Sequence, residues 1–161
     1  MTQHFPESRD QLIPLSIFRR LAAFFYDSLL CLALLMTTTG LYMIISSAIM
    51  GAEHYQKITE SGQTINDPLL SSILFITAFL FFGYFWTKNG QTLGMQAWHL
   101  RVQNTDNSSI SWKQALKRFL MSIISIGSFG LGIIWPLIDK QQRSWQCIYS
   151  KSEIVRIPKK N

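Results

Sequence analysis

The chain has 161 residues, 48% of them hydrophobic and only 15% charged, and it carries a formal net charge of +6. The charged fraction is well below the roughly 25% of an average soluble protein. Neither the two cysteines nor the three histidines have the spacing of a disulfide framework or a metal site, and no nucleophile, phosphate-loop or paired-carboxylate motif is present. We therefore expect no metal, no cofactor and no enzymatic activity. The basic charge is better explained by loops that face anionic lipid than by nucleic acid, which we do not expect as a partner.

Three long apolar stretches dominate the sequence. Residues 21–49 contain one side chain that is charged at neutral pH, Asp27, and residues 69–86 and 119–138 contain none. A transmembrane helix needs about 20 mostly apolar residues at about 1.5 Å each. The pattern predicts an all-α integral membrane protein with two transmembrane helices and a third apolar segment.

In chain order, a polar leader (1–16) precedes the first helix. This helix is expected to run from near Ile17 to about Ala48, which is longer than a bilayer requires. Residues 51–68 are expected to form a polar loop, because turn-forming residues recur in them. The second helix follows over residues 68–86 and ends in aromatic side chains of the kind found at a membrane interface.

The second half of the chain adds strands and a further helix. Residues 99–104 alternate between apolar and polar side chains in the manner of a strand. A second alternation, near Ile154 and Arg156, predicts a partner for it in a minor cytoplasmic β-strand pair. Ser111 and Gln114 have the spacing of a capping box that opens a helix.

The distribution of basic residues predicts an orientation in the membrane. Lysine and arginine together number 3 in residues 1–20, 1 in 51–68, 5 in 87–118 and 6 in 139–161. Because basic residues stay on the cytoplasmic side, the N-terminus, the second loop and the tail are expected inside and the first loop outside. A single crossing by the third apolar segment would instead place the tail outside. Two geometries remain open for that segment: a re-entrant or interfacial hairpin, which the charges favour, and a spanning helix.

Four motifs along the chain resemble those of one family. They are Arg20-Leu-Ala-Ala-Phe-Phe-Tyr-Asp27, Gly90-Gln-Thr-Leu-Gly94, Trp98-His-Leu-Arg-Val102 and Trp135-Pro-Leu-Ile-Asp139. In order and spacing they resemble the RDD family of bacterial membrane proteins over about residues 17–157, which leaves 1–16 as a leader and 158–161 as a basic end. One segment departs from the pattern. After Trp145 the family typically shows His-Asp-Arg-Leu-Ser, whereas this chain has Gln146-Cys-Ile-Tyr-Ser150.

The resemblance implies a multi-pass protein of the bacterial inner (plasma) membrane, usually described with about three membrane helices. It also implies three candidate functional residues, because the arginine and the two aspartates that name the family fall on Arg20, Asp27 and Asp139. Molecular activity in the family is largely unassigned, although some members are linked to sodium–proton exchange.

Asp27 is the sharpest functional feature, because a carboxylate in a membrane helix is costly and usually faces protein or water. Arg20 lies seven residues earlier on nearly the same helix face and is a candidate partner. Two roles remain open. We favour a structural carboxylate in a structural or accessory membrane component, and the alternative is an ion pathway in a proton-coupled monovalent cation transporter that acts as an oligomer. The expected partners are membrane lipid and either further copies of the chain or other membrane proteins.

Overall fold

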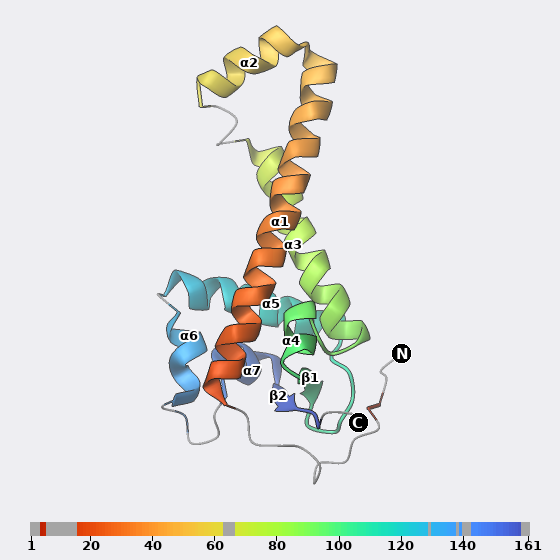
Figure 1. The fold of residues 1–161 in the computed structure, drawn as a ribbon, viewed down its shortest axis with the longest axis vertical. Coiled ribbons are helices and arrows are strands. Elements are labelled where there is room, and N and C mark those ends of the chain that lie inside the picture. The colour runs from red at the N-terminus through yellow and green to blue at the C-terminus, as the bar shows by residue number, and fades with distance from the viewer. Residues whose placement is uncertain are drawn as a thin grey trace. The chain divides into compact units, whose positions relative to one another are not determined.

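A computed structural model describes residues 4–5, 16–62, 67–128, 130–137, 139 and 143–158. Most of the predicted leader and of the basic C-terminal end lie outside these residues. The chain forms two compact units, one made of Leu29–Phe81 and the other of Met1–Ser28 together with Phe82–Asn161. Figure 1 labels their helices and strands.

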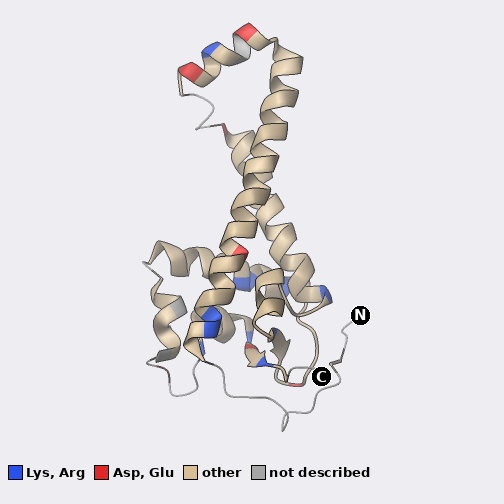
Figure 2. Ribbon diagram, in the orientation of Figure 1, with Lys and Arg blue, Asp and Glu red and all other residues tan. Residues whose placement is uncertain are grey.

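Long apolar helices build the unit Leu29–Phe81 and extend beyond it. α1 (Ile17–Met50) has 34 residues and α3 (Pro68–Lys88) has 21, which corresponds to about 51 and 32 Å. Both lengths exceed a hydrocarbon core of about 30 Å. A core helix of a soluble protein would be mostly buried, yet none of the most apolar stretch of α1 is buried and only 22% of that of α3. Figure 2 shows both helices free of Lys, Arg, Asp and Glu over most of their length. By length and composition, these two helices can cross a membrane, as predicted.

The segment between these helices was predicted as a polar loop throughout, and that prediction was wrong. It contains α2 (Ala52–Glu60). Glu53 in the first turn and Lys57 in the last complement the helix dipole. The amide of Gln56 also donates a hydrogen bond of 2.9 Å to the carboxylate of Glu60 one turn later. The prediction extended the turn-forming pattern at the end of this segment to the whole of it, although its first part forms a short, polar, amphipathic helix.

A two-stranded antiparallel sheet lies in the other unit, as the alternating residues predicted. β1 (Leu100–Asn104) pairs with β2 (Ser152–Arg156), and Val102 stands opposite Ile154 at the centre of the pair. Leu100 and Val102 are almost completely buried, and β1 contacts both β2 and the preceding helix α4 (Leu93–Ala97).

The third apolar segment begins with α5 (Trp112–Gly127), which opens at the predicted capping box. The hydroxyl of Ser111 accepts a hydrogen bond from the backbone N–H of Gln114, and the side chain of Gln114 accepts one from the N–H of Ser111. α5 packs along α7 (Trp145–Ser150), so the helix is held on one side by the core of its own unit.

The same segment then breaks and reverses. Gly130 adopts a left-handed conformation (φ 77°) ahead of α6 (Leu131–Ile134), and a 3-10 turn, Trp135–Leu137, follows. α6 packs closely against α5: a Cβ at Gly132 would lie 2.5 Å from the hydroxyl oxygen of Ser125. The described residues of the segment therefore form a broken hairpin instead of one continuous helix, which is the geometry that the basic residues favoured.

α5 exposes an apolar face away from the core of its unit. Leu116, Leu120 and Ile123 are 40–44% exposed, whereas the neighbouring Phe119 is buried. Lys113 and Lys117 border this exposed face in the first half of the helix. An exposed apolar stripe bordered by lysines is typical of helices that lie in a membrane interface.

The break in the third segment predicts opposite effects for two glycine-to-alanine changes. Gly130→Ala should destabilise the protein by about 1 kcal/mol, because an alanine disfavours the left-handed conformation. Gly127→Ala should be neutral or stabilising, since Gly127 is helical and has no atom within 4 Å of the position of a Cβ. Thermal unfolding in detergent measures both. A stabilising Gly130→Ala would indicate a continuous helix through this segment.

Candidate functional site

Asp27 caps a neighbouring helix. Its carboxylate, on α1, is 6% exposed and accepts a hydrogen bond from the hydroxyl of Thr92. It accepts a second one, 2.9 Å long, from the backbone N–H of Gly94. Thr92 is the N-cap residue of the short helix α4 (Leu93–Ala97), and its hydroxyl in turn accepts from the N–H of Met95. The carboxylate therefore accepts one of the backbone N–H groups in the first turn of α4, where unpaired N–H groups favour a negative charge.

The motif at residues 90–94 has the residues that this contact requires. A Cβ at Gly94 would lie 2.5 Å from the carbonyl oxygen of Ala23 and 2.9 Å from the carboxyl carbon of Asp27, so only glycine allows α4 this close to α1. Gly90 has φ 66°, and a Cβ there would meet the carbonyl oxygen of Val102 at 2.6 Å. The two glycines thus serve two close approaches, one to α1 and one to β1.

Arg20 lies seven residues before Asp27 on α1 and does not pair with it. Its Nη1 atom is buried and has no hydrogen-bond partner among the described residues. It lies near enough to the sulfur of Cys147 to act on it electrostatically, together with Arg118 of α5. The side chain of Arg118 is itself buried and donates a hydrogen bond of 2.7 Å to the hydroxyl of Ser152.

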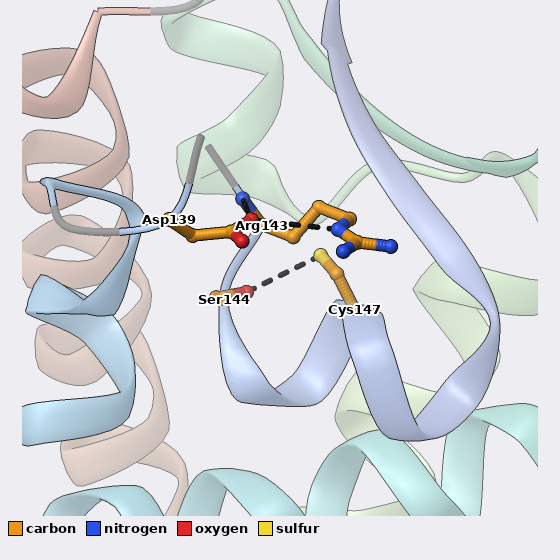
Figure 3. A network of polar contacts seen from close by, with 4 residues as sticks. All are labelled: Asp139, Arg143, Ser144 and Cys147. Carbon is orange, nitrogen blue, oxygen red and sulfur yellow. Dashed lines mark hydrogen bonds and ion pairs between the residues drawn. The ribbon is translucent and has the colours of Figure 1, made fainter. Parts of the chain in front are cut away.

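Asp139 belongs to a different arrangement, which Figure 3 shows. Its carboxylate accepts a hydrogen bond of 2.8 Å from the backbone N–H of Arg143 and forms an ion pair of 3.4 Å with the side chain of the same residue. The adjacent Ser144 is the N-cap of α7 and donates from its hydroxyl to the sulfur of Cys147 at 3.2 Å. The carboxylate of Asp139 thus contacts the residue that directly precedes the N-cap of α7.

The structure does not gather the three candidate residues into one site. Asp27 contacts α4, Arg20 faces the Arg118–Cys147 cluster, and Asp139 pairs with Arg143. Among the described residues, no group of three or more His, Cys, Asp or Glu is placed to hold a metal ion.

Sequence reasoning missed Thr92 and Cys147, and it considered Arg118 only as a partner for Asp27, whereas Arg118 contacts Cys147 and Ser152. The motif around Thr92 was recognised, and its N-cap position after a glycine turn was the signal that could have suggested a helix there. No local signal linked Arg118 to Cys147, because the two are 29 residues apart and meet only through packing.

The close approach of α4 to α1 predicts a specific cost for one added methyl group. Gly94→Ala should destabilise the protein by about 1–3 kcal/mol, because the Cβ overlaps backbone atoms that cannot move aside cheaply. Gly40→Ala is the matched control within α1: nothing lies within 4 Å of its Cβ position, so it should be neutral or stabilise by up to about 1 kcal/mol. Both are measured by thermal unfolding in detergent. Equal stability of the two variants would contradict the Asp27–Gly94 contact.

Comparison with known proteins adds one relationship. No curated protein and no solved structure matches the chain. The sequence model of the RDD family matches residues 14–151, which is most of the chain and includes every helix from α1 to α7 that the structure describes. The chain therefore belongs to the RDD family.

Proposed function

We propose that this protein is a multi-pass component of the bacterial inner membrane with a structural or accessory role, exerted through lipid and through further copies of itself or other membrane proteins. The observation that carries this proposal is the apolar surface of α1 and α3. Side chains such as Met36, Ile44 and Ile49 are 66–78% exposed, and exposed apolar surface on this scale needs lipid or a protein partner to cover it.

The charge-free part of α1 is long enough for the crossing by itself. Residues 29–50 contain no charged side chain and would extend about 33 Å as a helix. The preceding turns of α1 carry Arg20 and Asp27 and belong to the other unit. On this assignment, the crossing begins after Asp27, and the carboxylate belongs to the folded unit beside the membrane.

The hairpin of α5 and α6 is assigned to the membrane surface on the cytoplasmic side. Its exposed face combines Leu116, Leu120 and Ile123 with Lys113 and Lys117, so the apolar side chains can enter the acyl boundary while the ammonium groups meet anionic headgroups. This placement keeps the basic tail on the same side as the basic second loop, as the positive-inside rule requires.

The contacts of Asp27 favour the structural role over ion passage. Both carboxylate oxygens are engaged, one by the hydroxyl of Thr92 and one by the N–H of Gly94. In an oligomer, the hydroxyls of Thr37 and Thr38 in a second copy could donate to Asp27. In this chain they donate instead to carbonyls of their own helix, those of Ala33 and Leu34. Proton-coupled cation transport remains the alternative that the experiments below separate.

Labelling with a membrane-impermeant maleimide tests the orientation. In a Cys31→Ser background, Glu53→Cys in α2 should react in intact cells, because the loop 51–68 is assigned to the periplasm. Thr105→Cys, in an exposed turn of the second loop, should react only after the cells are permeabilised. The native Cys147 is buried and should stay unreactive in both proteins. Labelling of Thr105→Cys in intact cells, at the rate of Glu53→Cys, would overturn this topology.

Substitution of Asp27 tests the role of its carboxylate. Asp27→Asn should keep most of the stability, because an amide oxygen can still accept from Gly94. Asp27→Leu should cost about 1–3 kcal/mol for each donor left without an acceptor.

Vesicles that hold the wild-type protein should show no more sodium-driven proton flux than empty vesicles.

Asp106→Asn is the control for loss of a carboxylate, since Asp106 lies in an exposed turn. Wild-type flux that disappears in Asp27→Asn and survives in Asp106→Asn would establish the transporter and refute the accessory role. A stability of Asp27→Leu equal to that of the wild type would instead refute the capping role.

A further inference from the structure

A buried cluster around Arg118 joins four elements of the unit that contains the sheet. Arg118 projects from α5 and is 3% exposed. Its Nη1 atom lies 2.7 Å from the hydroxyl of Ser152 in β2 and 3.5 Å from the sulfur of Cys147 in α7. Its guanidinium carbon lies 5.2 Å from the centre of the Trp86 ring, at the end of α3.

This cluster contains more positive charge than its hydrogen bonds account for. The Nε atom of Arg118 and the Nη1 atom of Arg20 are both buried without a hydrogen-bond partner. Within the described part of the chain, no carboxylate forms an ion pair with either arginine. A buried cation is costly unless an anion accompanies it.

The sulfur of Cys147 is the acidic group placed to supply that anion. Its side chain is 2% exposed, and it receives hydrogen bonds from Arg118 at 3.5 Å and from the hydroxyl of Ser144 at 3.2 Å. Burial raises the pKa of the Cys147 thiol, but the charges of Arg118 and Arg20 and the two hydrogen bonds outweigh burial and hold the pKa below its ordinary value. Two donors directed at one sulfur, one of them a cation, match a thiolate better than a thiol, which is only a weak acceptor.

We propose that Cys147 is held as a thiolate and acts as the buried counter-ion of Arg118, which locks α7 onto α5. The thiolate is a positioning group and carries no reaction of its own, because the core that surrounds it excludes solvent. Its charge holds the α5–α7 contact on which the apolar hairpin rests.

The protonation state is measured directly in the full-length protein in detergent. In a Cys31→Ser background, the ultraviolet absorbance of thiolate, taken as the difference from Cys31→Ser/Cys147→Ser, should titrate below the ordinary cysteine pKa of about 8.5. Arg118→Met should raise this midpoint. A midpoint at or above the ordinary value in the Cys31→Ser protein would overturn the proposal, and this result does not depend on whether Arg118→Met folds.

A charge series at the same position supplies a second readout. Cys147→Ala should lower Tm by at least about 6 °C, because it leaves the buried cation of Arg118 without an anion. Cys147→Asp restores a negative charge and should recover most of that loss, whereas the uncharged Cys147→Ser should not. Equal Tm values for the aspartate and alanine variants would contradict a counter-ion role and leave only packing.

The pH dependence has a defined sign. If folding lowers the pKa of Cys147, the thiolate contributes its full stabilisation at pH values above the unfolded-state pKa of about 8.5. This stabilisation is lost as the pH falls through the pKa of the folded state. The Tm difference between the Cys31→Ser protein and its Cys147→Ala variant should therefore shrink toward acidic pH. A difference that stays constant with pH would show a neutral thiol and refute the proposal.

Discussion

The carboxylate of Asp27 is the constraint on which much of the folded unit depends. A buried carboxylate must find donors, and Asp27 finds them in the hydroxyl of Thr92 and the N–H of Gly94. That contact seats α4 on α1 and leaves no room for a side chain at position 94. β1 begins three residues after α4 and pairs with β2, so the capped helix also sets where the sheet starts. One ionisable group thus links the first helix to the middle and the end of the chain.

The residues that name the family perform separate structural tasks in this chain. Arg20 contributes charge beside Cys147, Asp27 caps α4, and Asp139 pairs with Arg143 next to the N-cap of α7. Each task ties a helix end or a loop to the unit that contains the sheet. The three contacts lie apart, whereas residues of a catalytic or transport site converge on one place.

Different stretches of the chain provide apolar surface suited to lipid and a packed, hydrogen-bonded unit. The apolar residues 29–50 and most of α3 present side chains suited to lipid, and they carry almost no internal polar chemistry. The first turns of α1, up to Ser28, and the described residues from Phe82 onward instead build a packed unit with a sheet, capped helices and buried hydrogen bonds. α5 combines both tasks, because it buries Ala115 and Phe119 against the core and exposes an apolar stripe bordered by lysines. This division explains how an ionisable residue such as Asp27 can lie on a helix long enough to cross a membrane.

The sequence by itself determined the elements whose signals are local. Long charge-free runs marked α1 and α3, alternation marked both strands, and Ser111 with Gln114 marked the start of α5. It also singled out Asp27 as a buried carboxylate in need of partners. Only the tertiary structure decided what those partners are, that the third apolar segment breaks at Gly130, and that Arg118 meets Cys147. These contacts join residues 29 to 67 positions apart, and hydrophobic periodicity and capping preferences describe only neighbours within a few turns, so pairing across the chain is settled by packing alone.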